Sequence, residues 1–357
     1  MPDAHTLLAT LRRHVDDAHT RLLTDALGEL TAVDTRLDPL ADELTVYMHG
    51  GKRLRPILLL LGYLSALSDT ADPTPAIGPA LATELLHTCA LMHDDIIDQS
   101  ATRRGRPSVH TGFAKRHREG GLAGDSDVYG TAVAILLGDL AFTYADRAFF
   151  TSTAEAKPLL AAFQAFTRLR EEVMAGQFLD VEAAAQENTD LETALNIAAL
   201  KSGRYSVARP LEIGATLADA SAQHVAGLFT FGEPLGRAFQ LKDDLLGVFG
   251  DVATTGKSAN SDLIENKRTV LIAETLAASD AATRDYVETH LGAPAADPDV
   301  AERLRNIIID TGAKDAVMRR IADETRASAD ALATLSMEPI YRQAFVTVST
   351  LLTERNK

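Results

Sequence analysis

Apolar residues recur at every third or fourth position along most of this chain, and that spacing is the strongest constraint on its fold. It is typical of amphipathic α-helices that bury one face. The segments with this spacing are 5–30, 80–98, 131–150, 158–185, 191–220, 222–250, 264–290 and 315–355. Valine and isoleucine do not alternate with polar residues, so no strand is predicted. The sequence therefore predicts an all-α fold.

Turn-forming residues separate the helical segments without forming a long linker. The breaks fall at 68–79, 119–130, 250–262 and 292–299. We find no repeat of about 20 to 50 residues, which disfavours a solenoid. With 357 residues, 46% of them hydrophobic, the chain can bury a sizeable core. We expect one helical domain over residues 1–357.

The charge balance limits the partners of the chain. Asp plus Glu number 50 against 35 Lys plus Arg, which gives a net charge of −15. This charge repels nucleic acid and anionic membranes over most of the surface, so no nucleic-acid partner is predicted. An anionic ligand would have to be held locally, by clustered basic residues or through a metal ion.

Cysteine content and apolar stretches indicate the compartment. The single cysteine, Cys89, excludes an internal disulfide and a cysteine-based zinc site, and it fits a reducing compartment. The N-terminal segment carries charges every few residues and lacks the apolar stretch of a signal peptide. The uncharged apolar stretch at 57–68 has about half the length of a membrane span. We therefore expect a cytoplasmic protein without a membrane span.

Two aspartate clusters each follow an apolar segment. The first, LMHDDIIDQS, contains Asp94, Asp95 and Asp98, and the second, FQLKDDLLGVFGD, contains Asp243 and Asp244. On a helix Asp94 and Asp98 share a face, where like charges repel unless a cation compensates them. Oxygen ligands alone favour a hard cation such as Mg²⁺, which shares its coordination with phosphate oxygens. A solvated acidic helix face would explain one cluster, but two clusters behind apolar segments favour a magnesium site.

Basic residues that suit a diphosphate lie in other segments. In HGGKRLRP, Gly51 allows close backbone approach, Lys52 and Arg55 supply charge, and the helix start that follows favours anions. The remaining basic candidates are Arg103 and Arg104 in TRRGRPSVH, Lys201 in LKSGRYS, and Lys257 and Lys267 in GKSANSDLIENKRT. The spacing is not that of a Walker A loop. Each residue could instead be a solvated surface charge, the interpretation we prefer for AKRHRE at 114–119.

Taken in order, these motifs resemble those of the trans-isoprenyl diphosphate synthases, also called polyprenyl synthetases. The segments that carry the resemblance are GGKRLRP, HDDIID, RRGRPSVH, LLGDLAF, GQFLD, KSGRYS, FQLKDDLLGVFGD and GKSANSDLIENKRT, within residues 40–275. The resemblance implies a helical bundle around a central cavity and a homodimer. It also implies Mg²⁺-dependent head-to-tail condensation of isopentenyl diphosphate with dimethylallyl, geranyl or farnesyl diphosphate.

The resemblance also implies roles for individual residues. It assigns Asp94, Asp98 and Asp243 as direct Mg²⁺ ligands, with Asp95 and Asp244 supporting them. It assigns Arg103, Lys201 and Lys257 to the allylic diphosphate, and Lys52, Arg55, His87 and Arg104 to isopentenyl diphosphate. Lys201, Ser202 and Gln240 form the expected catalytic set beside the reacting carbons, and Gly51, Gln177, Asp180 and Lys267 are expected to line the same site.

One position departs from the family pattern. The second motif of the family commonly ends in a third aspartate, and Gly247 stands there in this chain. Because the first aspartate of that motif is the expected direct ligand, we predict that the metal site keeps its function with a weaker outer shell.

Residues just before the first aspartate cluster bear on product length. Farnesyl enzymes of the family usually carry an aromatic residue at the fourth or fifth position before Asp94, where this chain has Ala90 and Cys89. The floor of the product channel would then drop by one helical turn, to Leu86 or Leu85, which favours twenty-carbon geranylgeranyl diphosphate. Farnesyl and longer products stay open, because a helix at 131–145 could set the floor. Alternatively, Cys89 and Ala90 only let two helices pack closely.

Two other functions compete with this prediction. A class I terpene cyclase also ionises allylic diphosphates, but it would carry a different second metal motif and many aromatic residues. This chain has no tryptophan and only 5% aromatic residues, which disfavours a cyclase. A non-catalytic regulatory subunit should have lost aspartates from the first motif, and this chain has kept them.

Overall fold

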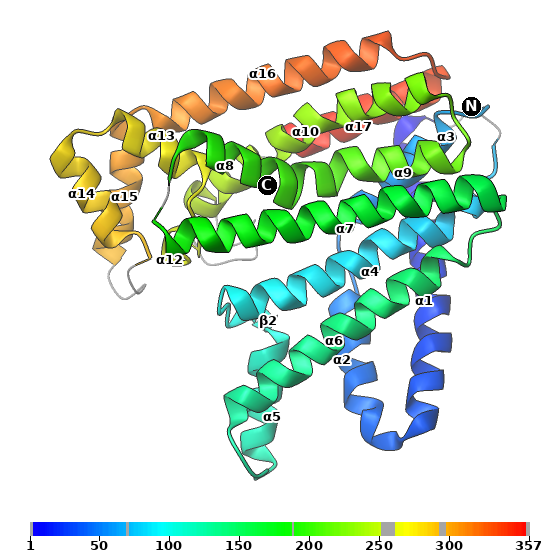
Figure 1. The fold of residues 1–357 in the computed structure, drawn as a ribbon, viewed down its shortest axis with the longest axis horizontal. Helices are drawn as coiled ribbons and strands as arrows, with labels where there is room; N and C mark the ends of the chain where they lie inside the picture. Colours follow the sequence, from blue (N-terminus) through cyan, green and yellow to red (C-terminus); the bar gives the residue numbers. More distant parts are fainter. Residues whose placement is uncertain (1–2, 69–70, 188, 251–260, 293–297, 355–357) are drawn as a thin grey trace.

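The protein is a bundle of helices with one short hairpin, which confirms the predicted all-α fold (Figure 1). The computed structural model describes residues 3–68, 71–187, 189–250, 261–292 and 298–354. In its first half the helices are α1 (Ala4–Val33), η1 (Thr35–Leu37), α2 (Asp38–Met48), α3 (Leu54–Leu64), α4 (Thr74–Ile97), α5 (Val109–Glu119) and α6 (Ser126–Phe149). They are followed by α7 (Ala156–Ala185), α8 (Leu191–Ile197), η2 (Ala198–Ala208), α9 (Arg209–Leu217) and α10 (Ala222–Phe249). The last are α12 (Ser261–Ile264), α13 (Val270–Ala278), α14 (Ala281–His290), α15 (Pro298–Asp310), α16 (Ala313–Thr334) and α17 (Pro339–Thr353).

Two of the helices that the sequence spacing predicted as continuous are broken in the structure, those at 264–290 and 315–355. Local side-chain caps explain the breaks in the first. The Thr269 hydroxyl accepts a hydrogen bond from the amide of Ile272 at the start of α13, and the Asp280 carboxylate caps α14 in the same way. The break between α16 and α17 precedes Pro339, whose ring disfavours helical backbone at the residue before it.

The spacing analysis missed two elements near the first aspartate cluster. One is α5, which contains the basic segment 114–119. The other is an antiparallel hairpin of β1 (Thr102–Arg103) and β2 (Arg106–Pro107), which follows α4. Gly105, with φ of +74°, permits the tight turn between these strands. The hairpin folds the chain back toward α4, so that Arg103 reaches the aspartates of that helix.

The buried apolar residues form two clusters that meet at α10. The larger cluster joins α1–α7, η2, α9 and α17, and includes the almost fully buried α3. The smaller cluster joins α8 and α12–α16. Leu228 and Leu235 of α10 pack in the larger cluster, whereas Leu241 and Leu245 pack in the smaller one. Both aspartate motifs therefore lie on helices anchored in buried apolar cores.

The helix α6 has the length and mean hydropathy, 1.4, of a membrane span. Within the described residues it alone meets these criteria, which a core helix of a soluble protein can also meet. It packs against α4 and α5, and 44% of its most apolar window is buried in the fold.

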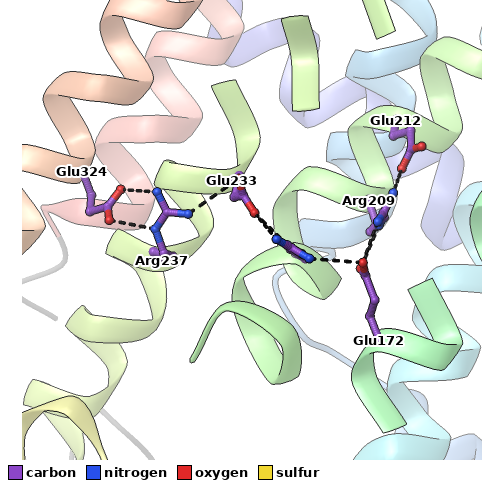
Figure 2. A network of polar contacts seen from close by, with 7 residues as sticks. Glu172, Arg209, Glu212, Glu233, Arg237 and Glu324 are labelled. Carbon is purple, nitrogen blue, oxygen red and sulfur yellow. Dashed lines mark hydrogen bonds and ion pairs between the residues drawn. The ribbon is translucent and has the colours of Figure 1, made fainter. Parts of the chain in front are cut away.

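A chain of ion pairs fixes η2 between its neighbours (Figure 2). Arg204 of η2 lies 2.6 Å from Glu233 of α10 and 3.4 Å from Glu172 of α7. Arg237 of α10 then forms two hydrogen bonds of 2.7 and 2.8 Å with Glu324 of α16. These alternating charges connect η2 with α7, α10 and α16.

Candidate active site

One cavity of about 370 Å³ collects most of the residues that the sequence analysis singled out. It lies between α3, α4, α7, η2, α10 and the segment 262–269. The predicted residues that line it are Gly51, Lys52, Arg55, His87, Ala90, Asp94, Arg103, Arg104, Gln177, Asp180, Lys201, Ser202, Gln240, Asp243, Asp244 and Lys267. Among the described residues, the lining leaves out Leu86, Cys89, Asp95 and Asp98. Lys257 lies outside the described residues.

Asp95 anchors the β1–β2 hairpin instead of facing the cavity. Its side chain is 1% exposed, and the guanidinium of Arg103 donates to its Oδ1 atom, with a distance of 2.8 Å from Nε. The hydroxyl of Tyr47 donates to the other carboxylate oxygen at 3.4 Å. Burial raises the pKa of Asp95 although Arg103 opposes that shift. Asp95 therefore holds Arg103 beside Asp94, at 3.8 Å.

Two lysines form ion pairs with Asp94 and Asp98 of the first motif. The Nζ atom of Lys201 lies 3.4 Å from Asp94 and 2.6 Å from Asp180. Burial would lower the pKa of Lys201, but these two carboxylates raise it overall. Lys267 occupies the corresponding place between Asp98 and Glu265, with distances of 3.4 and 2.7 Å. Both ammonium groups stay protonated and could turn from carboxylate to phosphate.

The aspartate clusters carry more negative charge than these lysines compensate. Burial and the neighbouring Asp94 raise the pKa of Asp98 to about 6. Burial and Asp262 raise the pKa of Asp244 well above its usual range, although Gln240 donates a hydrogen bond of 2.6 Å to it. Raised pKa values of this kind indicate a site that would be stabilised by an added cation.

The donor chemistry of these residues fits Mg²⁺. Asp94, Asp98, Asp243 and Asp244 offer only carboxylate oxygens, the ligands of a hard cation. Within the described residues, no group of three acidic, histidine or cysteine side chains is close enough to hold a metal in this arrangement. Asp94 and Asp98 would have to exchange their lysine partners for the ion.

The structure explains the glycine at the end of the second motif. A Cβ atom at Gly247 would lie 1.9 Å from Oδ2 of Asp262, so any side chain there would displace that carboxylate. Asp262 is buried and lines the cavity beside Asp244. The chain thus has a carboxylate from α12 beside the position where the family commonly has a third aspartate.

Two of the residues assigned to isopentenyl diphosphate, Arg55 and His87, lie beside the Tyr205 ring. Arg55 donates to the Ser206 hydroxyl at 2.7 Å, and its guanidinium lies 4.3 Å from the centre of the Tyr205 ring. Burial, together with Arg55 and Arg104, lowers the pKa of His87 well below its usual value, so this ring is neutral. The Nδ1 atom of His87 and the Nε atom of Arg55 are buried without a hydrogen-bond partner among the described residues. Such buried groups suit a polar ligand.

Close helix packing places Lys201 and Ser202. Both lie on η2, a π-helix of a kind that often marks functional sites. A Cβ atom at Gly176 of α7 would lie 2.4 Å from the Lys201 amide nitrogen, and one at Gly236 of α10 would lie 2.2 Å from the Gly203 oxygen. Glycines on both neighbours therefore let η2 approach closely enough to reach the cavity.

The three residues considered for product length differ in position. Ala90 lines the cavity. Cys89 is buried with its Sγ atom 3.8 Å from Nδ1 of His93, whose ring fills the space above Gly138 of α6. Burial raises the pKa of the Cys89 thiol to about 12. Leu86 is buried in the core next to it.

The sequence analysis did not single out several lining residues, among them Arg53, Glu84, Tyr205, Ser206 and Asp262. Glu84 had a detectable signal, because it is the one acid in the apolar segment ALATELLHTCALM. Arg53 is one of three basic residues in HGGKRLRP, and nothing in the local sequence indicates that it is buried while Lys52 faces the cavity.

An all-α bundle with two aspartate motifs and two basic groups around one cavity defines a class of enzyme that acts on diphosphate esters. The family model for polyprenyl synthetase matches residues 38–308, and the chain belongs to this family of prenyltransferases. It is 34% identical over 269 residues to geranylfarnesyl diphosphate synthase of Aeropyrum pernix, covering 74% of this chain and 78% of that protein. It is 32% identical over 287 residues to geranylgeranyl diphosphate synthase of Mycobacterium tuberculosis, covering 80% and 75%.

Solved structures of polyprenyl synthases are also similar to this chain. A geranylgeranyl pyrophosphate synthase from Corynebacterium glutamicum, complexed with isoprenyl diphosphate and magnesium, has a TM-score of 0.92 and 33% identity, over 96% of this chain and 98% of that one. A polyprenyl synthase from Caulobacter crescentus, complexed with calcium and isoprenyl diphosphate, has a TM-score of 0.79 and 27% identity, over 98% and 97%.

Proposed function

We propose that this protein condenses isopentenyl diphosphate with an allylic diphosphate to form a linear all-trans prenyl diphosphate, with geranylgeranyl diphosphate as the main product. The observation that carries the proposal is one cavity lined by Asp94 and Asp243, from two helices, together with the basic residues Lys52, Arg55, Arg103, Arg104, Lys201 and Lys267. The names of the similar proteins support the same reaction.

The allylic diphosphate would bind between the two aspartate motifs. Lys201 and Arg103 would turn from their carboxylates to its phosphate oxygens. Asp94, Asp98 and Asp243 would hold Mg²⁺, which when bound would supply positive charge to the leaving diphosphate. The bond between the allylic carbon and the diphosphate oxygen breaks, and the positive charge left on the allyl group needs polar groups nearby.

Isopentenyl diphosphate would bind to Lys52, Arg55, His87 and Arg104, which line the same cavity. Its double bond attacks the allylic cation, a carbon–carbon bond forms, and one proton is lost. Ser202, Gln240 and Gln177 line the same cavity and are proposed to stabilise the cation by their dipoles. The Nε2 atom of Gln177 is buried without a hydrogen-bond partner among the described residues, which suits such a role.

The proposed product length rests on the small residues before Asp94. Ala90 is small and lines the cavity, and Cys89 and Leu86 before it are buried. Relatives named geranylgeranyl diphosphate synthase from Mycobacterium tuberculosis and Sulfolobus acidocaldarius, at 32% and 34% identity, support twenty carbons. Other relatives are named farnesyl or geranylfarnesyl diphosphate synthase, so farnesyl and longer products are the alternative.

We further propose a cytoplasmic homodimer in which residues 1–357 act as one domain. Apolar side chains exposed on α6 and α7 support an interface between copies, among them Leu136 at 61% and Phe178 at 63% exposure. The cavity is lined by residues from both apolar clusters, which supports one catalytic domain.

Release of diphosphate tests the proposed reaction. Purified protein with isopentenyl and farnesyl diphosphates should release inorganic diphosphate only when Mg²⁺ is present. Asp94→Asn and Asp243→Asn should each abolish release, and Asp42→Asn, at an exposed position on α2, should leave it unchanged. Equal release by all four proteins, or release in the presence of EDTA, would contradict the proposal.

A further inference from the structure

Arg53 combines a buried charge with unusual backbone geometry. It lies between Lys52 and Arg55 in the glycine-rich segment, yet its side chain is only 4% exposed. Its backbone is left-handed, with φ of 52° and ψ of 35°, a conformation that non-glycine residues adopt at a cost in free energy. Such a cost persists only where surrounding contacts hold the residue in place, and these contacts can be named.

Three elements hold the guanidinium of Arg53. Its Nε atom donates to Asp16 of α1 at 2.9 Å, and its Nη1 atom donates to Glu84 of α4 at 2.9 Å. Its Nη2 atom donates to the carbonyl oxygen of Met48 at the end of α2, at 3.1 Å. All three guanidinium nitrogens therefore have protein partners, and Arg53 is not the group that binds a phosphate.

The helix α1 contacts the same segment a second time. Arg12 donates from Nη2 to the carbonyl oxygen of Gly51 at 3.0 Å. On its other side, Gly51 faces the end of Glu84: a Cβ atom there would lie 3.6 Å from Glu84 Oε1 and 3.7 Å from Arg104 Nη2. Glu84 thus contacts the buried Arg53 and, like Arg104, lies close to Gly51 and lines the cavity.

We propose that Arg53 is a positioning residue for the isopentenyl diphosphate subsite, and that α1 sets the affinity of this subsite through Asp16 and Arg12. The inference rests on the proposed function, which assigns Lys52, Arg55 and Arg104 to that diphosphate. Arg53 fixes the backbone from which the first two project, and Glu84 ties that backbone to α4. The helix α1 lies before residue 38, where the match to the family model begins.

The effect of α1 is confined to one substrate. The residues proposed for the allylic diphosphate take their support elsewhere, because Lys201 is held by Asp94 and Asp180, and Arg103 by Asp95. Loosening the glycine-rich segment therefore changes the isopentenyl end of the cavity and leaves the aspartate motifs in place.

The test removes the contacts from α1 and leaves the buried pair intact. Asp16→Ala removes the partner of Arg53 Nε, and Arg12→Ala removes the donor to Gly51. Each variant has a matched control one residue away on the same helix, Asp17→Ala and Arg13→Ala, with the same change of charge at an exposed position. KM for each substrate is measured at saturating concentration of the other, together with kcat and the midpoint of thermal unfolding.

Asp16→Ala and Arg12→Ala should each raise KM for isopentenyl diphosphate roughly fivefold to tenfold, the size expected for loss of one typical hydrogen bond. KM for farnesyl diphosphate and kcat should stay within about twofold, as should all constants of both controls. Arg53→Lys, which keeps the charge but cannot reach three partners, should show the same selective change.

Two results would overturn the inference while the proposed function stands. One is an active wild-type enzyme whose Asp16→Ala and Arg12→Ala variants keep the wild-type KM for isopentenyl diphosphate. The other is an equal rise of KM for both substrates, which would mean a general loss of structure. A wild-type protein that forms no prenyl product would instead overturn the proposed function, and the inference with it.

Discussion

The Nζ atom of Lys267 lies 3.4 Å from Oδ2 of Asp98 and so connects the segment after α12 to α4. This lysine holds a carboxylate that the proposed function assigns to Mg²⁺. Burial would lower the pKa of Lys267, but Asp262, Glu265 and Asp98 raise it well above its usual value, so it is always charged. We therefore expect Lys267 to compete with Mg²⁺ for Asp98 and to bind phosphate when substrate is present.

Replacing Lys267 should separate these two roles. Lys267→Met should tighten binding of Mg²⁺ alone roughly tenfold, because one competing ion pair is lost, and it should lower turnover because a phosphate contact is lost. Calorimetric titration with Mg²⁺ and steady-state kinetics measure the two effects. Lys115→Met, at an exposed site on α5, is the control. Weaker Mg²⁺ binding by Lys267→Met would show that the lysine does not compete.

A side chain at Gly247 should harm the enzyme even if it restores the aspartate common in the family. Its Cβ atom would lie 1.9 Å from the buried Asp262 carboxylate. We expect Gly247→Ala and Gly247→Asp to lower the free energy of unfolding by about 1 to 3 kcal/mol and to reduce activity. Gly28→Ala, with open space around it in α1, should be neutral or stabilising. Urea unfolding measures all three, and a more active Gly247→Asp enzyme would refute this account of the position.

Bulk at Ala90 should shorten the product more than bulk at Cys89. Ala90 lines the cavity, whereas Cys89 packs beside His93 toward α6. Ala90→Phe should therefore stop elongation near fifteen carbons, and Cys89→Phe should shorten the product to a lesser extent. Mass spectrometry of the products measures the chain length that each variant makes. An unchanged product spectrum in both variants would place the floor elsewhere, for instance on α6.

Stability should fall in mild acid because of His19. Burial, and then the nearby Arg53, lower the pKa of His19 from 6.5 to about 4, while Asp16 opposes the shift and His49 adds to it. Between these pH values the unfolded chain binds a proton that the folded protein excludes, so the free energy of unfolding falls as pH drops from 6.5 toward 4. The shift corresponds to about 3 kcal/mol at most.

Urea unfolding of the wild type and of His19→Gln between pH 7.5 and 4.5 measures this effect. The two curves should diverge below pH 6.5, with the wild type losing more stability. Parallel curves would mean that His19 accepts a proton in the folded protein.

The helices and the aspartate motifs were predictable because their signals are local. The spacing of apolar residues determines which face of a helix is buried, and it placed Asp94 and Asp98 on one helix. The breaks within 264–290 depend on caps by Thr269 and Asp280, which compete with a weak helical preference.

The supports of the site were not predictable from local pattern. Arg53 contacts Asp16 and Glu84, which are 37 and 31 residues away along the chain. The role of Gly247 depends on Asp262, a residue on another helix. Contacts at such separations follow from packing, which sequence spacing does not report.

Mass spectrometry of the products tests the central claim most directly. Purified protein is given isopentenyl diphosphate with dimethylallyl, geranyl or farnesyl diphosphate, in Mg²⁺ or in EDTA. We predict linear prenyl diphosphates that require Mg²⁺ and end at twenty carbons. A cyclic hydrocarbon, or no prenyl product from any of the three starters, would contradict the claim.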